Sequence, residues 1–185
     1  MTIVNTNRYG FAVENLGDQS VFYRCNLEGY NTTLYMHGKS QFYRNCTFRG
    51  HSSLVFGFAN SFFQKCEFFS MKAYPQEMVV FFSQSSPLND FSQFIFHLCS
   101  FHVVKESPNS SATAFLGGYF GTLPSTVAVL LSSLDEYIDG YYFQEPATFF
   151  GASACYDLLQ FRLRIFFWAA TPSRRLPPIP SSPMT

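Results

Sequence analysis

Short runs in which apolar and polar residues alternate recur along most of the chain. The segment 20–27, SVFYRCNL, contains the two-residue alternation of a strand with one buried face. Glycines separate such runs, and we interpret them as turn residues: Gly29, Gly38, Gly50 and Gly57. No segment before residue 150 carries the apolar stripe of a helix. The pattern therefore predicts an all-β domain built from short strands.

One of these runs returns as a repeat. FYRC at 22–25 is followed by FYRNC at 42–46 and FFQKC at 62–66, each ending in a cysteine, and a weaker copy, FIFHLC, occupies 94–99. Such a regular, short period is typical of solenoids, in which stacked units bury an apolar face that each unit alone leaves exposed. We predict a parallel β-helix with Cys25, Cys46 and Cys66 close together on one face. Three unrelated strands of an antiparallel sandwich are the alternative.

Composition narrows the choice of partners. The chain has 185 residues, of which 47% are hydrophobic and 13% charged, with Lys+Arg and Asp+Glu both at 12. This balance argues against a nucleic-acid partner, which requires a basic surface, and against a polybasic membrane surface. The 24 Phe and 11 Tyr fit the core of a β-rich domain. A subset that lines a sugar-binding groove is compatible with that interpretation.

The end of the chain differs from the rest. Residues 174–183, RRLPPIPSSP, are rich in proline and cannot join a ladder of strands. We therefore divide the chain into a β-helix domain, 1–150, and a divergent, partly disordered tail, 151–185. The longest apolar tract, 158–170, contains two arginines and is too short to span a bilayer. No secretory signal is visible at the start, so we expect a soluble chain or a fragment that lacks its beginning.

Cysteines and sequons indicate the compartment rather than a metal. The five cysteines form no C-x-x-C pair, so a zinc site is not expected. We expect no other metal and no cofactor. N-x-S/T triplets begin at Asn31, Asn45 and Asn109. Together with the cysteines, they favour an oxidising, extracellular destination.

Residues 17–66 carry a longer motif. They read GDQSVFYRCNLEGYNTTLYMHGKSQFYRNCTFRGHSSLVFGFANSFFQKC, which resembles the plant pectinesterases (pectin methylesterases), whose pattern is GDxxxFYRCxxxGYQDTLYxHxxRQFYRDCxxxGTVDFIFGNAxxxFQxC. TIVNT at 2–6, AFLGGYF at 114–120 and LDEYID at 134–139 are similar to further family segments. The resemblance covers roughly residues 1–145. It implies a right-handed parallel β-helix with pectin in an outer groove, and a family domain longer at the N-terminal end than this chain.

The same resemblance implies a reaction. The family hydrolyses the methyl ester of galacturonate units with two aspartates, one as general acid and base and one as nucleophile, helped by an arginine and by glutamines that stabilise the oxyanion. In this chain the matching positions hold Asn31, Thr32, Ser53 and Gly118. Threonine cannot exchange a proton as a carboxyl does, and serine without a base is a poor nucleophile. We therefore expect impaired catalysis, with a pectin-binding pseudoenzyme or a truncated, non-functional product as alternatives.

A different mechanism is a weaker hypothesis. His51 lies two residues before Ser53, and a strand would place both side chains on one face. No acid is positioned to orient that histidine, so a serine nucleophile is disfavoured. His37, His97 and His102 are interpreted as structural or surface residues.

The aromatic positions of the family's groove are better kept than its acids. They correspond to Tyr35, Phe56, Phe115 and Phe120, the last in place of the family's tryptophan. Core packing is the rival interpretation for the first three. The family also implies a disulfide between Cys66 and Cys99. As partners we expect a pectin chain and a proteinaceous pectinesterase inhibitor, with the protein itself a monomer, secreted to the plant cell wall.

Overall fold

The computed structural model describes residues 1–71, 78–84, 92–104, 113–119, 125–130, 132–134, 138–143 and 148–153. Within these ranges every regular element is a strand. The strands are β1 (Thr2–Asn5), β2 (Phe11–Asn15), β3 (Ser20–Tyr23), β4 (Asn26–Gly29), β5 (Thr32–Arg44), β6 (Thr47–Gly50), β7 (Ser53–Gln64), β8 (Glu67–Ser70), β9 (Met78–Gln84), β10 (Ser92–His97), β11 (Ser100–Val103), β12 (Thr113–Tyr119), β13 (Ser125–Leu130), β14 (Ser133–Leu134), β15 (Ile138–Phe143) and β16 (Thr148–Ser153). A helix of the length and apolarity needed to cross a membrane is not found in this part of the chain.

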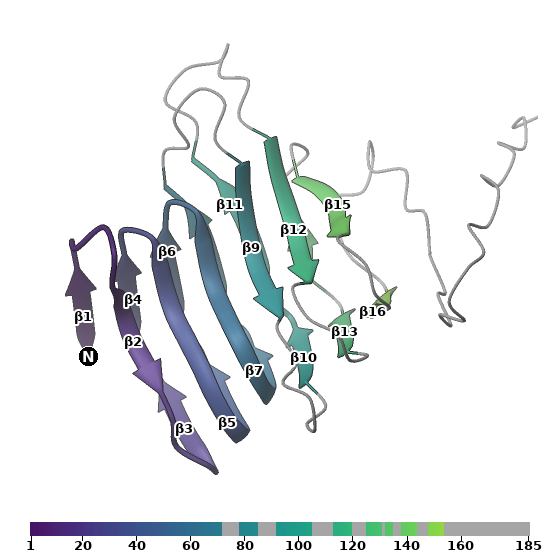
Figure 1. The fold of residues 1–185 in the computed structure, drawn as a ribbon. Coiled ribbons are helices and arrows are strands. Elements are labelled where there is room, and N and C mark those ends of the chain that lie inside the picture. Colours follow the sequence, from purple (N-terminus) through teal and green to yellow (C-terminus); the bar gives the residue numbers. More distant parts are fainter. Residues whose placement is uncertain are drawn as a thin grey trace, which may run out of the picture.

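The strands form a parallel β-helix (Figure 1). One sheet has the order β1-β4-β6-β8-β11-β14. In the other, the long strands β5 and β7 pair with β2 and β9 over their first halves and with β3 and β10 over their second halves. The described pairs are parallel, which confirms the predicted fold class and excludes the antiparallel sandwich.

Each coil of the solenoid contributes one strand, or one half of a long strand, to each of three faces. The described residues form six coils, which are β1–β3, β4–β5, β6–β7, β8–β10, β11–β13 and β14–β16. Register places Cys25, Cys46, Cys66 and Cys99 at the same position in successive coils, because the residues on either side of each cysteine are paired. The predicted stacking of the cysteines is confirmed, and the weak copy at 94–99 is the next coil.

Corners bend the chain just before each of the four cysteines that the structure describes. Arg24, Asn45, Lys65 and Leu98 all have φ between 52° and 55°. This left-handed conformation turns the chain sharply and costs most residues about 1–2 kcal/mol, asparagine less. The segment 20–27, predicted as one strand, is therefore two strands, β3 and β4, with a corner between them. In the sequence, apolar residues continue at every second position across the corner, so sequence periodicity alone does not reveal it.

Two of the glycines that were predicted to mark turns lie inside long strands. Gly38 lies inside β5, where the register with β7 shifts between His37 and Ser40. Gly57 lies inside β7 with φ 127°, and an added Cβ would overlap the Met36 carbonyl oxygen. Both glycines lie where a long strand passes from one face of the solenoid to the next, and they permit close contact between coils there.

Aromatic rows fill the core. One row is Phe22, Tyr43, Phe63 and Phe96, whose rings stack at 5.2, 4.8 and 4.8 Å. A second row, Phe48, Phe68 and Phe101, stacks at 4.8 and 4.9 Å. The rows meet edge to face, at interplanar angles of 69–81°. Burial of each ring contributes roughly 1.5–3 kcal/mol, so much of the unusual phenylalanine content serves packing.

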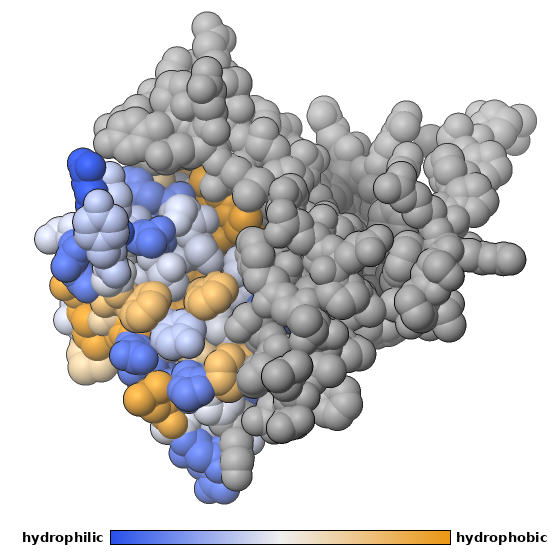
Figure 2. Space-filling model, viewed as in Figure 1, coloured by the Kyte–Doolittle hydropathy of each residue, from blue (hydrophilic) through white to orange (hydrophobic). Residues whose placement is uncertain are grey.

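The surface agrees with the balanced composition. Figure 2 shows hydrophilic and hydrophobic residues interspersed over the described part of one face. The predicted tail, 151–185, lies outside the described residues from 154 onward, while β16 extends to Ser153.

Candidate functional site

Thr32 and Ser53 occupy equivalent places in adjacent coils. Each begins a long strand, β5 or β7, and the two are register partners. Neighbouring strands lie about 4.8 Å apart, so the two side chains project from adjacent points of the same sheet. Thr32 is only 7% exposed, whereas Ser53 is half-buried. Two positions well separated in the sequence are thus brought together by one turn of the solenoid.

Short polar contacts connect the coils at the beginning of β5 and β7. The Ser52 hydroxyl donates to Asn31 Oδ1 at 2.5 Å, and the Ser53 amide donates to the Asn31 carbonyl at 3.2 Å. The Ser53 hydroxyl donates to the hydroxyl of Ser83, in β9, at 3.4 Å. The candidate site is therefore a row of hydroxyl and amide groups that runs across three coils.

Among the side chains that the structure describes, this row offers hydrogen bonds but no acid or base at its centre. A pair of carboxylates can divide the roles of proton donor and nucleophile because their pKa values are driven apart. Hydroxyl groups at Thr32 and Ser53 do not titrate near neutral pH. Glu14 is exposed, and its register partner on β5 is Tyr35 rather than Thr32.

The alternative nucleophile arrangement is not supported by the local geometry. His51 precedes β7 instead of lying within it, so strand alternation does not align it with Ser53. Its ring packs against Tyr30 at 4.8 Å. His37 contacts Phe58 edge to face at 4.4 Å, and His102 stacks on Phe69 at 4.8 Å. The described residues contain no group of three or more metal-binding side chains.

Aromatic rings form a stack beside the hydroxyl row. Phe11, Tyr35 and Phe56 come from three successive coils, with ring centroids 4.7 and 5.6 Å apart and interplanar angles of 19° and 18°. Tyr35 is sandwiched, so both of its faces are covered and only its edge and hydroxyl remain available. Phe11, which is 37% exposed at one end of the stack, was not identified from the sequence. Its register partner in the next coil is Thr32, so its ring reaches Tyr35 diagonally, which the sequence spacing does not indicate.

The remaining predicted positions lie further along the same face. Register connects Tyr35 and Phe56 to Ser83 and then to Gly118, so Gly118 lies two strands beyond Phe56. Phe115 is the partner of Val80, which pairs with Ser53. Only the backbone of Phe115 and Gly118 is described, and Phe120 lies outside the described residues.

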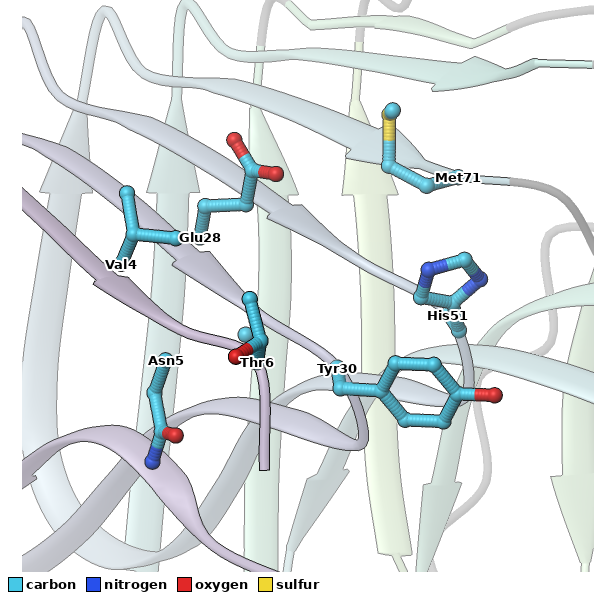
Figure 3. Close-up of a pocket in the computed structure, with 8 residues that line it drawn as sticks. Val4, Asn5, Thr6, Glu28, Tyr30, His51 and Met71 are labelled. Carbon is cyan, nitrogen blue, oxygen red and sulfur yellow. The ribbon is translucent and has the colours of Figure 1, made fainter. Parts of the chain in front are cut away.

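A small pocket lies near the ends of β1 and β4, before the chain enters β2 and β5. Figure 3 shows Glu28, Tyr30 and His51 around it, with Asn5 and Thr6 from the first coil. Backbone hydrogen bonds join Tyr30 to Asn5 and His51 to Tyr30, so three coils build the wall. The Arg8 guanidinium lies 5.3 Å from the centre of the Tyr30 ring. Sequence reasoning did not identify this pocket, because its residues match no spacing rule.

The predicted disulfide partners are free thiols in this structure. Cys25, Cys46, Cys66 and Cys99 are buried and unbonded. A hydrogen bond with Cys66 and then burial raise the pKa of Cys46 well above its usual range. The Cys46 thiol lowers the pKa of Cys66, but the Cys99 thiol and burial outweigh it and raise that pKa to about 12. The Cys66–Cys99 bond stays a prediction.

The fold and the row of aligned positions define a member of the parallel β-helix class. A family model described as Pectinesterase matches residues 2–156. This match covers most of the chain, and the protein belongs to the pectinesterase family.

Individual proteins of the same family also match the chain. Pectinesterase 2 of Citrus sinensis is 34% identical over 123 residues, which are 63% of this chain and 24% of that protein. Probable pectinesterase/pectinesterase inhibitor 47 of Arabidopsis thaliana is 48% identical over 61 residues, 33% of this chain and 10% of that protein. The chain thus spans about a quarter or less of these relatives.

Solved structures share the fold. Pectin methylesterase from carrot has a TM-score of 0.76 and 22% identity, and the match covers 84% of this chain and 53% of that one. Rice weevil pectin methyl esterase has a TM-score of 0.72 and 16% identity, covering 84% of this chain and 54% of that one.

Proposed function

We propose that this chain is a pectinesterase-family protein that binds pectin and is impaired in hydrolysis of its methyl esters. The observation that carries the proposal is the pairing of Thr32 with Ser53 in adjacent coils. The family's two aspartates correspond to these positions, and hydroxyl groups replace both carboxyls. Loss of one member of a catalytic unit lowers the rate by orders of magnitude, and further losses add little.

Methanol release from highly methylated pectin tests the catalytic part. We expect the wild-type chain and its Ser53→Ala variant to release methanol at the same rate, equal to the background rate. A wild-type rate clearly above that of Ser53→Ala would contradict the proposal. Circular dichroism and cooperative unfolding are measured on both chains, because a product that does not fold would support the truncated, non-functional alternative instead.

The ring stack supports the binding part. Sugar rings pack against aromatic surfaces because both present flat apolar faces. In this stack the middle ring, Tyr35, offers only its edge and hydroxyl, while Phe11 retains exposed area at one end. We therefore place the apolar sugar contact on the ends of the stack and a polar contact on the Tyr35 hydroxyl.

Affinity electrophoresis in a gel that contains homogalacturonan tests this arrangement. Phe11→Ala is expected to weaken binding roughly 2–10-fold, the size of one aromatic contact. Tyr23→Ala is the matched control, since Tyr23 is an exposed aromatic residue on β3, away from the stack. Equal retardation of the wild type and both variants would contradict pectin binding at this face.

Location and protein partners follow from the family alone. A secreted protein of the plant cell wall fits a pectin ligand, and a proteinaceous pectinesterase inhibitor is the expected protein partner. Detection of a tagged chain in isolated cell walls, and co-purification with an inhibitor protein, are the direct measurements.

A further inference from the structure

Four cysteines form a ladder along the axis of the solenoid. Register aligns Cys25 with Cys46, Cys46 with Cys66, and Cys66 with Cys99, one cysteine in each of four consecutive coils. Each Sγ contacts the carbonyl oxygen of the residue two positions earlier. The last three also contact a carbonyl of the preceding coil, at 3.5 Å. The side chains therefore repeat the same conformation and point the same way.

Spacing limits which thiols can bond. Paired residues of adjacent strands lie about 4.8 Å apart, within the Cα separation of about 4.4–6.8 Å that a disulfide accepts. Cysteines two coils apart lie at roughly twice that distance, beyond the limit. Three bonds are thus possible within the ladder, and each joins immediate neighbours. A bond between Cys46 and Cys66 would leave Cys25 and Cys99 without a partner in reach.

Only one arrangement pairs all four thiols. We propose that the structure assigns a Cys25–Cys46 disulfide, which forms together with Cys66–Cys99 and excludes Cys46–Cys66. The first bond joins the second and third coils, and the other joins the fourth and fifth. The resemblance to pectinesterases implies Cys66–Cys99 and gives Cys25 no partner among the other cysteines of this chain. The Cys25–Cys46 bond follows from the geometry of this chain.

The chemistry requires an external oxidant of the small-disulfide class, such as oxidised glutathione. A thiolate attacks the small disulfide and forms a mixed disulfide, and the neighbouring thiolate then displaces the second small thiol. Two S–H bonds are lost and one S–S bond forms, while two electrons and two protons reduce the oxidant to two thiols. Burial raises the pKa of Cys25, and the neighbouring Cys46 adds to this effect, so oxidation is expected during folding rather than in the folded chain.

Peptide mapping tests the assignment directly. The full chain is refolded with reduced and oxidised glutathione, free thiols are alkylated, and the product is digested with trypsin without reduction. Cleavage after Arg24, Lys39, Arg44, Arg49 and Lys65 places Cys25, Cys46 and Cys66 on separate peptides. We expect the peptide 25–39 to be joined to 45–49, and the peptide that begins at Cys66 to be joined to the one that contains Cys99.

Other results would overturn the proposal: a Cys46–Cys66 bond, a bond from Cys25 or Cys46 to Cys155, or alkylation of both Cys25 and Cys46 in folded protein. In Cys25→Ser we expect Cys46 to be alkylated while Cys66–Cys99 persists. Cys155→Ser, which leaves the four ladder cysteines in place, is the control and should leave both bonds unchanged. Reduction of the wild type should lower Tm by roughly 6 °C or more, since each bond closes a loop as long as one coil.

Discussion

Thr32 and Ser53 lie side by side in neighbouring coils, as the first residues of β5 and β7. Two carboxyls at these points would lie close enough for one to raise the pKa of the other, which is the division that acid–base and nucleophilic roles require. The scaffold therefore retains the spacing of a carboxyl pair while it carries hydroxyls.

Restoring the acids tests whether the scaffold still supports the chemistry. The variant Asn31→Gln, Thr32→Asp, Ser53→Asp, Gly118→Arg is expected to release methanol from methylated pectin at least about 100-fold faster than the wild type. The control carries Thr32→Asn and Ser53→Asn with the other two changes, so shape is kept without acidity. If the restored variant folds but does not exceed this control, the groove itself has been lost.

Buried tyrosine and cysteine side chains predict that the protein loses stability at alkaline pH. Burial raises the pKa of Tyr43 far above its usual range, partly offset by a hydrogen bond from Asn15, and the pKa of Cys66 is raised to about 12. These groups stay protonated when folded but ionise when unfolded, so their stabilising effect is complete below about pH 9 and is lost as pH rises toward 12. In reduced protein, the free energy of unfolding should fall by about 1.4 kcal/mol per pH unit for each group.

Urea unfolding between pH 7 and 11 measures this loss. Tyr43→Phe should be about 1–3 kcal/mol less stable at pH 7, because the Tyr43 hydroxyl accepts from Asn15 and donates to Gln41 at 2.9 and 2.8 Å. Its stability should fall less steeply than that of the wild type above pH 10. Parallel curves for the two proteins would show that Tyr43 is not a source of the alkaline loss.

Gly57 is expected to be intolerant of any side chain. Its φ is 127°, and an added Cβ would meet the Met36 carbonyl oxygen, which is backbone and cannot move aside. Gly57→Ala should therefore destabilise the protein by roughly 3 kcal/mol or more. Gly17→Ala is the control. Its Cβ would lie 3.3 Å from the Asn15 side chain, which can shift slightly, whereas the backbone at Met36 cannot. Equal midpoints of denaturation for the two variants would contradict this prediction.

Leu98 offers the opposite case, a position where substitution should help. It occupies a corner with φ 55° and is 40% exposed, so an apolar side chain gains little there. Asparagine tolerates this conformation and is already present at the equivalent corner, Asn45. Leu98→Asn should raise the free energy of unfolding by about 0.5–1 kcal/mol. Asn45→Leu, the reciprocal change, should lower it, and a shift in the same direction for both would refute the explanation.

The sequence predicted the solenoid because a stacked fold repeats its packing positions. Interior aromatic residues and cysteines recur at nearly equal intervals in the first coils, and the motif at 17–66 aligned Thr32 and Ser53 with a known pair of positions. The later coils were harder to detect. The interval from Cys66 to Cys99 is longer than the interval from Cys46 to Cys66, and the interval from Cys99 to Ser132, where serine replaces cysteine, is equally long.

Local pattern by itself determined strands, repeat, family motif and the residues at the candidate site. Only the tertiary structure decided where the chain turns, because corners at Arg24, Lys65 and Leu98 use residues that do not favour positive φ. Contact between coils also decided that Gly57 serves close approach and that Phe11 completes the ring stack with Tyr35. Such features depend on which residues become neighbours in adjacent coils. The number of residues in a coil varies along the chain, so the sequence alone does not identify these neighbours.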